Sequence, residues 1–392
     1  MVLKIKLCNF IPRKVEDIMS MGIYVHVPFC RSKCFYCGFY SVASLQLKKS
    51  YIQALCHEME LRGEYLPDRK ASTLYFGGGT PSYLDEWELE EIVNNIHKYW
   101  TLEDGAECSI EVNPEDAVPG KLHALKRLGF NRLTIGIQSF NDDVLKRINR
   151  THSAKQAIQA VENAVAAGFD NVGIDLIIGL PGSTSMDLEK EFNIISYLDI
   201  AHISVYILSI DSNSVFQKLS EKGKFRSQGD DELAEQYLLV SDFLKNMGYE
   251  HYEISNFAKN FKYSRHNTSY WQQKPYIGLG PSAHSFDLAS RQWNTAHLKS
   301  YIESLNKGQL NLEKEILSPR DKYNEYIMTR LRTMWGAEQA VLEQEFGNYW
   351  WQNRQKTEAY LKEGYVVPTE NGFRLTEKGW LISDAIFSNL FV

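Results

Sequence analysis

The first half of the chain alternates short apolar runs with stretches in which apolar residues recur at helical spacing. Residues 22–27, 73–76 and 109–112 are dense in apolar side chains and predict strands. Asp85 and Glu88 stand at the spacing of a capping box and predict the start of a helix. The apolar stripes of the predicted helices are Leu47, Tyr51, Leu55 and Met59; Leu89, Ile92, Val93 and Ile96; and Leu122, Leu125 and Leu128.

Two later segments repeat one transition. Gly129-Phe130 and Gly168-Phe169 each end an amphipathic stretch and lead into an apolar run. A glycine at this place is typical of the residue after a helix, which often needs positive φ. Gly248-Tyr249 begins a fainter third copy. Strands that alternate with helices predict a parallel sheet covered by helices.

We count about six strand–helix units between residues 22 and 206, which is too few for a closed eight-stranded barrel. An open, doubly wound sheet is one architecture of this class, and a partial barrel is the other. In both, a ligand is expected at the C-terminal ends of the strands.

The pattern changes after about residue 308. Residues 323–331 and 357–361 predict helices, and 363–379 predict a short hairpin, which together suggest a winged-helix-like module. The module lacks a basic stripe, so we expect a lid or docking role and not DNA binding. The predicted division of the chain is an N-terminal extension at 1–20, a main domain at 21–309 and a C-terminal domain at 310–392.

Composition narrows the function. The 392 residues carry a net charge of −6 with 23% charged residues, so the chain gives no electrostatic support for binding nucleic acid or an anionic membrane. No apolar run is long enough to span a bilayer, and none near the start is typical of a signal peptide. Cys8, Cys56 and Cys108 are scattered, as free thiols are in a reducing compartment. We therefore expect a cytoplasmic protein.

The other three cysteines stand close together. Cys30, Cys34 and Cys37 form a CxxxCxxC pattern that encloses aromatic residues. Three thiolates leave one iron of a [4Fe–4S] cluster without a protein ligand and open to a small molecule. A tetrahedral zinc site is the alternative, but zinc usually takes four protein ligands, and no CxxC or HxxxH pair follows. The spacing favours a three-cysteine iron–sulfur cluster.

The surrounding residues resemble a known family. YVHVPFC at 24–30 and FYC at 35–37 are similar to the opening of radical S-adenosylmethionine (SAM) proteins of the anaerobic coproporphyrinogen III oxidase superfamily, and similarity extends to Gly280. The resemblance implies a partial, open (βα)6 barrel and a [4Fe–4S] cluster whose open iron binds SAM. The oxidase has a fourth cysteine where this chain has Phe39. That difference and the run HNTSYW at 266–271 resemble the heme chaperone (HemW) branch.

The resemblance also implies a set of SAM contacts at successive strand ends. Glu111 stands among apolar residues and needs a cationic or hydroxyl partner if it is buried. Asp175 interrupts an apolar strand, and we expect it to bond the SAM ribose or to pair with Arg150. His26 is expected to orient the cysteine loop. The implied SAM-binding residues are Tyr24, Tyr36, Gly78, Gly79, Thr80, Glu111, Gln138, Arg150 and Asp175.

The HNxxYW run is the candidate heme site. We expect it to be a polar, aromatic loop in which His266 ligates heme iron through a neutral imidazole, while Tyr270 and Trp271 pack on the macrocycle. His284 is the second candidate ligand.

Two functions follow from the resemblance. The first is a heme chaperone that binds a [4Fe–4S] cluster, SAM and heme and delivers heme to an acceptor protein, with any membrane association through that acceptor. The alternative is an oxygen-independent coproporphyrinogen III oxidase of porphyrin biosynthesis, which decarboxylates its substrate through a 5′-deoxyadenosyl radical. Phe39 argues against the oxidase. A SAM-dependent methyltransferase is a third class, but the chain lacks a further cysteine constellation or a basic face that would support it.

Overall fold

A computed structural model of the chain describes residues 20–211 and 214–392. The predicted N-terminal extension lies outside these ranges except for Ser20. The largest element is a twelve-stranded sheet, in the order β12-β11-β10-β9-β1-β2-β3-β4-β5-β6-β8-β7. Its parallel centre follows chain order and comprises β1 (Met21–Val27), β2 (Lys70–Gly78), β3 (Thr101–Val112), β4 (Arg132–Gln138), β5 (Val172–Ile178) and β6 (His202–Ile207).

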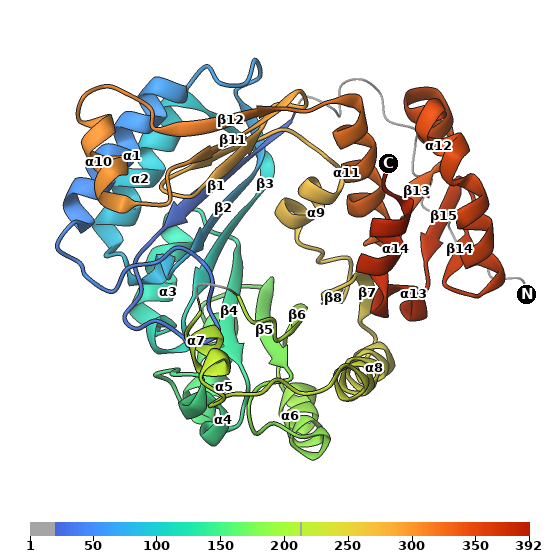
Figure 1. Ribbon diagram of the computed structural model, residues 1–392. Helices are drawn as coiled ribbons and strands as arrows, with labels where there is room; N and C mark the ends of the chain where they lie inside the picture. Colours follow the sequence, from blue (N-terminus) through green and yellow to red (C-terminus); the bar gives the residue numbers. More distant parts are fainter. Residues whose placement is uncertain (1–19, 212–213) are drawn as a thin grey trace, which may run out of the picture.

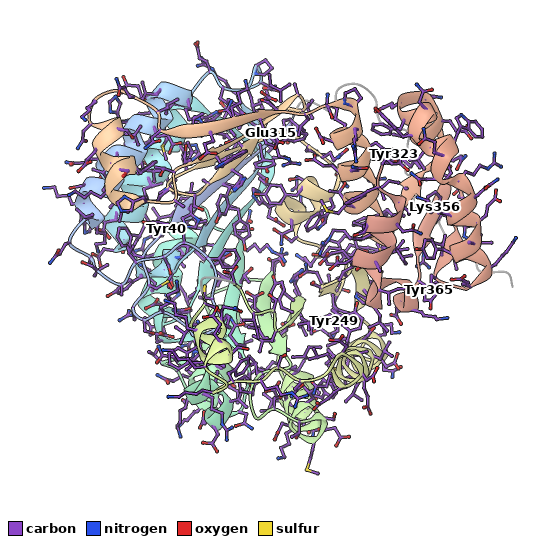
Figure 2. The ribbon with its side chains drawn as sticks, viewed as in Figure 1. Tyr40, Tyr249, Glu315, Tyr323, Lys356 and Tyr365 are labelled. Atoms are coloured by element: carbon purple, nitrogen blue, oxygen red, sulfur yellow. The ribbon has the colours of Figure 1, made fainter. Side chains whose placement is uncertain are left out.

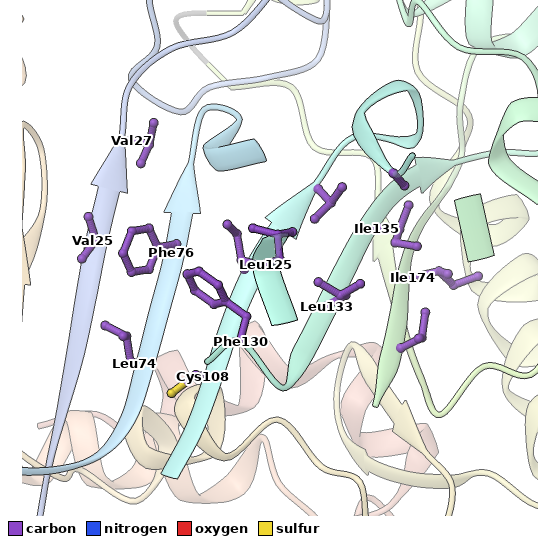
Figure 3. Packing of buried hydrophobic residues seen from close by; sticks show 14 of the residues in the cluster. Val25, Val27, Leu74, Phe76, Cys108, Leu125, Phe130, Leu133, Ile135 and Ile174 are labelled. Atoms are coloured by element: carbon purple, nitrogen blue, oxygen red, sulfur yellow. The ribbon is translucent and has the colours of Figure 1, made fainter. Parts of the chain in front are cut away.

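Helices cover the outer face of these strands, while the strands curve around an open interior (Figure 1). Apolar side chains between strands and helices form the main core, where Phe76 of β2 contacts Phe130 edge to face at 5.2 Å and Leu125 of α3 packs nearby (Figure 3). The helices of this layer are α1 (Lys48–Arg62), α2 (Glu86–Tyr99), α3 (Pro119–Arg127), α5 (Ala154–Ala166), α6 (Ser185–Tyr197) and α8 (Asp230–Asn246). Two further helices, α4 (Asp142–Arg147) and α7 (Val215–Glu221), form a separate apolar cluster with Phe35 and Tyr36 of the cysteine loop.

Later segments of the chain extend the sheet at both edges. β9 (Tyr276–Leu279) pairs parallel with β1, and β10 (His284–Phe286), β11 (Ser290–Asn294) and β12 (Leu312–Ile316) continue antiparallel. Helix α10 (Leu298–Leu305) packs on α1. At the opposite edge, β8 (Asn256–Ala258) and β7 (Glu250–Glu253) follow β6 and are also antiparallel.

A buried ion pair fastens the β9 extension to α1. Arg62 donates to Glu58 (3.0 Å) and to the carbonyl of Gly278 (2.8 Å), which lies 216 residues further along the chain. Glu58 also accepts from the backbone N–H of Gly280 (2.8 Å) and the hydroxyl of Tyr301 (2.6 Å). A buried carboxylate requires such partners, since an unpaired charge in the core is strongly unfavourable.

The C-terminal part forms a second core beside the β7–β8 edge (Figure 1). Tyr323, labelled in Figure 2, is buried in this core and accepts a hydrogen bond from Asn353. The large sheet reaches Ile316, which argues for a domain boundary after that residue and not after residue 309. The elements are α11 (Pro319–Leu331), β13 (Ala337–Glu338), α12 (Gln339–Lys362), β14 (Val366–Pro368), β15 (Gly372–Leu375), α13 (Glu377–Leu381) and α14 (Ser383–Leu390).

The predicted fold class is confirmed. The sheet is open, its first six strands are parallel, and the predicted capping box of Asp85 and Glu88 begins α2. Gly129 and Gly168 follow their helices with φ of +90° and +83°, as the repeated pattern predicts. The fainter copy after Gly248 is also a strand, although it pairs antiparallel. Within the described ranges, no helix combines the length and apolar character needed to cross a membrane.

Candidate functional site at the strand ends

A cavity of about 520 Å³ lies at the C-terminal ends of the parallel strands and is open to the cysteine loop. Its lining includes most of the residues that the sequence singles out, although they are spread over more than 140 positions of the chain. The predicted residues that line it are Cys30, Cys34, Tyr36, Cys37, Gly78, Gly79, Thr80, Glu111, Gln138, Arg150 and Asp175.

The cysteine loop is held on both sides. The backbone N–H of Cys30 donates to Val42 (3.1 Å), and that of Phe35 donates to Ile148 (3.1 Å). Arg150 donates to Cys34 Sγ and Thr80 donates to Cys30 Sγ, each at 3.6 Å. The five described cysteines are all free thiols, and burial raises the pKa of Cys37 to about 11. A metal that binds here must therefore displace protons from the thiols.

The glycine-rich turn after β2 is shaped by packing on β1. Gly78 has φ +107°, and a Cβ at Gly79 would lie 2.8 Å from the carbonyl oxygens of Val27 and Phe29. The backbone N–H of Gly79 donates to Val27 (2.8 Å) and that of Thr80 to Phe29 (2.8 Å). Because the N–H groups are used within the protein, a ligand at this turn would be met by carbonyl acceptors.

Two partly buried carboxylates face the cavity from β3 and β5. Glu111 accepts from the hydroxyl of Tyr75 (2.9 Å) and the N–H of Gly78 (3.2 Å), so the predicted hydroxyl partner is present. Burial, and next the charge of Asp175, raise the pKa of Glu111 to about 8. Burial also raises the pKa of Asp175 to about 6, and its Oδ1 has no hydrogen-bond partner within the protein. The pair would be stabilised by a cationic or hydroxyl-bearing ligand.

Arg150 and Gln138 line the same cavity as these two carboxylates. Arg150 donates to Asn113 Oδ1 (3.2 Å) and to the carbonyl of Gly136, while its buried Nε has no partner within the protein. It therefore does not form the ion pair with Asp175 that was one expectation. Gln138 ends β4 with φ +74°, a conformation that is uncommon for a residue with a side chain, and it lines the cavity.

Several cavity residues were missed by sequence reasoning. Asn113 links Arg150 to the Thr80 hydroxyl (3.4 Å), and Tyr206 enters the cavity from the end of β6. Asn113 directly follows β3, and Tyr206 lies near the end of β6. The rule that strand ends carry ligand contacts would therefore have found them.

Tyr24 lies in the barrel interior but does not line this cavity. Its hydroxyl and Nδ1 of His26 are 3.1 Å apart, and Nε2 of His26 is 3.0 Å from the carbonyl of Tyr40. His26 therefore connects β1 to the residues after the cysteine loop, and its role in orienting that loop stays a prediction.

The expectation that HNxxYW is a loop was wrong. These residues form most of α9 (Arg265–Trp271), whose first turn is capped by Ser264 through the N–H of Asn267. Helix formation is possible for this polar sequence because the Ser264 cap satisfies a backbone donor and Glu107 accepts from the N–H groups of Arg265 and His266.

His266 is buried with a relative exposure of 1% and does not line the strand-end cavity. Its Nδ1 is 2.8 Å from the hydroxyl of Thr73, its Nε2 is 2.7 Å from that of Tyr270, and its ring stacks on Tyr75. Burial lowers the pKa of His266 to about 3. Iron ligation by His266 stays a prediction, and it would require one of these hydroxyls to be displaced. The fallback ligand His284 is exposed and stacks on Trp293.

Comparisons with known proteins follow the same division of the chain. A family model described as the radical SAM superfamily matches residues 24–195, and one described as the HemN C-terminal domain matches residues 317–382. The curated relative "Heme chaperone HemW" of Bacillus subtilis is 34% identical over 93% of this chain and 97% of its own length. The protein of the same name from Mycobacterium tuberculosis H37Rv is 32% identical over 94% of both chains.

A solved structure supports the fold independently. Coproporphyrinogen III oxidase (HemN) from Escherichia coli, described as a radical SAM enzyme, superposes with a TM-score of 0.83 over 95% of this chain and 90% of its own. Its sequence identity to this chain is 24%, so the likeness establishes the shared architecture alone.

Proposed function

The chain belongs to the HemW family of the radical SAM superfamily, and on that premise we propose that it is a heme chaperone with a [4Fe–4S] cluster and SAM at the strand-end cavity. The observation that carries the proposal is that proteins named heme chaperone HemW are 34% and 32% identical to this chain over more than nine tenths of its length. Delivery of the bound heme to an acceptor protein is part of this proposal.

The donor set of the cavity supports the cluster. Three free thiols meet there, and Cys30 and Cys34 already receive hydrogen bonds from Thr80 and Arg150. Donors directed at sulfur stabilise the thiolate form that a metal requires. Three protein ligands leave one iron of a [4Fe–4S] cluster open.

The charge of the cavity supports SAM as the further ligand. Glu111 and Asp175 are partly buried carboxylates whose pKa values are raised, so the cavity favours a ligand that brings positive charge. SAM carries an ammonium and a sulfonium group. The carbonyl groups of the turn at Gly78 and Gly79 suit an ammonium donor, the unpartnered Asp175 Oδ1 suits a ribose hydroxyl, and Arg150 suits a carboxylate.

When bound, the cluster and SAM supply one-electron chemistry, and this chain's residues position them and limit access of water. Tyr36 and Ile177 form apolar parts of the wall, and Tyr206 stands at the rim. Phe39 is also at the rim, is 69% exposed, and replaces the cysteine that the oxidase carries. This replacement favours the chaperone over coproporphyrinogen oxidation.

The heme chaperone and the coproporphyrinogen III oxidase predict different results for hemin binding and for product formation by the reconstituted protein. Titration with hemin, followed by its Soret absorbance, is expected to saturate at about one heme per chain. In parallel, the reduced protein is incubated anaerobically with SAM and coproporphyrinogen III, and no protoporphyrinogen IX is expected. Formation of protoporphyrinogen IX over many turnovers would replace the chaperone by the oxidase. Absence of saturable hemin binding would remove the chaperone proposal.

A further inference from the structure

A second cavity, of about 760 Å³, lies at the opposite ends of the strands, between the barrel and the C-terminal domain. We call it the interdomain cavity. Its barrel side is formed by the start of β2, by α9 and by the segment that precedes α9, and its far side by Met334 and Trp335 after α11. Figure 1 shows α9 between the sheet and helix α11, where these elements meet. It is the larger of the two cavities described.

Aromatic rings from both domains form its walls. Tyr263 contacts Trp335 edge to face at 5.7 Å between ring centroids, and Phe261 contacts Tyr263 in the same way at 6.3 Å. Backbone pairing fixes Trp335 in place, because the N–H of Met334 donates to Tyr252 (2.9 Å). The cavity therefore presents ring faces and edges at fixed positions, which suits a flat, conjugated ligand.

Phe261 belongs to neither of the two large hydrophobic cores. Its side chain is 77% exposed. Asn260 and Phe261 have φ of +52° and +59°, and this left-handed conformation is an outlier for a bulky residue. Both residues stand at the centre of a tight turn that the N–H of Lys262 closes on the carbonyl of Lys259 (2.9 Å), and this turn brings the ring of Phe261 into the lining of the cavity.

The polar lining of the same cavity contains both signs of charge, with the carboxylates of Glu103 and Glu250 as well as Arg265, and Arg265 is the group that suits an acidic substituent. Arg265 is exposed, and one of its guanidinium nitrogens donates to the carbonyl of Gly105 (2.7 Å). Thr268 is buried, lines the cavity, and its Oγ1 has no partner within the protein. The carboxylate of Glu250, also in the lining, already accepts from the hydroxyl of Tyr263.

We propose that the interdomain cavity binds the tetrapyrrole, with Phe261, Tyr263 and Trp335 against the macrocycle and Arg265 near its carboxylates. The proposal rests on the proposed function and names the place where that function holds its cargo. His266 lies one layer behind the wall, since the hydroxyl of Thr73, a lining residue, is bonded to its ring. Recognition is therefore of the ring plane and its acidic edge, and it does not require the iron.

Because the walls come from two domains, entry and exit of the ligand depend on the interdomain contact. Trp271 of α9 lies under the guanidinium of Arg332, at 4.1 Å from its ring centroid, and Arg332 is paired with Glu253 of β7 (3.0 Å). These contacts adjoin Met334 and Trp335 in the chain. A heme acceptor that loosens them would open the cavity without disturbing the strand-end cavity.

The test uses the full chain with its cluster reconstituted. Hemin and metal-free protoporphyrin IX are titrated separately into wild type, Trp335→Ala, Phe261→Ala and the control Trp351→Ala, whose tryptophan is 57% exposed on α12. Each cavity variant is expected to weaken both ligands by about tenfold, the effect of losing one well-placed aromatic contact. Trp351→Ala is expected to bind as wild type does. Iron content and the thermal unfolding midpoint confirm that each variant is folded.

Two outcomes would overturn the interdomain assignment while leaving the chaperone proposal in place. If wild type binds hemin but Phe261→Ala and Trp335→Ala bind it equally well, the interdomain assignment is wrong and the chaperone proposal stands. Saturable binding of hemin without any binding of metal-free protoporphyrin IX would also overturn the assignment, because it would show that iron ligation is required. If Trp335→Ala does not fold, Phe261→Ala decides, since this exposed side chain contributes little to the core.

Discussion

The two cavities lie at opposite ends of the same strands and are built in different ways. The strand-end cavity takes most of its lining from successive strands of one continuous sheet, and its charged groups include two partly buried carboxylates and Arg150. The interdomain cavity takes its walls from loops, a short helix and a second domain, and its buried titratable neighbour is the neutral His266. A site on a rigid sheet suits cofactors that stay, whereas a site between domains suits a cargo that must leave.

The two regions also respond to pH with opposite sign. Burial raises the pKa of Glu111 from 4.5 to about 8, so this group favours the folded state at low pH and loses that contribution as pH rises. Burial lowers the pKa of His266 from 6.5 to about 3, so this group loses stability as pH falls below 6.5. A cationic ligand would relieve the first effect but not the second.

The largest expected effect is the loss of the cluster in a cysteine variant, which should leave hemin binding at the other cavity unchanged. In Cys34→Ala, iron and sulfide after anaerobic reconstitution should fall from about four of each per chain to nearly none, because two thiolates are too few to hold the cluster. Hemin binding should remain within about twofold of wild type, since the interdomain cavity is remote from the cysteine loop.

The matched control is Cys56→Ala, a half-buried cysteine on α1 that does not line either cavity. It should keep its full iron content. A full cluster in Cys34→Ala would refute the three-cysteine site, and loss of both cluster and hemin binding would show that the cavities are not independent.

The second prediction concerns the interdomain contact. Arg332→Met leaves the carboxylate of Glu253, which is fully buried, without its cation. Loss of one partner of a buried ion pair costs about 3 kcal/mol, and urea unfolding should show that decrease. Hemin should also dissociate faster, while iron content stays unchanged.

Arg354→Met is the control, because Arg354 lies over the exposed ring of Trp351 at 5.5 Å and holds no buried charge. Its effect should be below about 0.5 kcal/mol. Equal unfolding free energies for the two variants would mean that Arg332 does not stabilise the domain contact.

The third prediction uses the opposite pH responses. Between about pH 7 and pH 5, the unfolded state binds a proton at His266 that the folded state excludes, which should lower the free energy of unfolding by about 2 kcal/mol. His266→Gln should remove this part of the slope. Other buried histidines contribute to the wild-type curve, so the difference between the two curves is the quantity to measure.

Glu111→Gln provides the comparison from the other cavity. Its curve should diverge from wild type as pH rises and converge with it as pH falls toward 4.5, the reverse of His266→Gln. Parallel curves for wild type and His266→Gln would contradict the neutral, buried histidine.

The smallest expected effect is a gain. Phe261→Gly replaces a residue at φ +59° by one that adopts this conformation freely, which should raise the free energy of unfolding by about 0.5–1 kcal/mol. Hemin affinity should fall in the same variant. A decrease in stability would show that Phe261 supports the fold and is not retained for the ligand.

The sequence was most informative where an apolar run predicts a strand and polar residues stand at the end of that strand. The apolar runs predicted the six parallel strands, and polar residues at their ends, such as Glu111 and Asp175, do meet in one cavity. This works because parallel strands bring their C-terminal ends to one edge whatever the loop lengths between them. The positive φ of Gly129 and Gly168 was also predictable, because the residue that follows a helix often needs this conformation whatever the rest of the fold.

The interdomain cavity was not predictable in this way. Trp335 and Phe261 are 74 positions apart, belong to no repeating unit, and become neighbours only through domain packing. The helix at HNxxYW was also missed, because its stability comes from Ser264 and from a carboxylate on β3, Glu107, and not from an apolar stripe. Nothing in the sequence marks Arg265 and Thr268 as candidate ligand contacts, and only their position in the cavity lining does so.

The place of β1 within the sheet has a consequence for synthesis of the chain. β1 is the first described strand, yet one of its edges is completed only by β9, and Glu58 and Arg62 of α1 find partners at Gly278 and Gly280. At a synthesis rate of about 5–20 residues per second, that edge stays unpaired for roughly 10–50 s on the ribosome. Long-range closure of this kind slows folding and leaves an apolar strand open to aggregation. The nascent barrel is therefore expected to depend on holding chaperones until residue 280 has emerged.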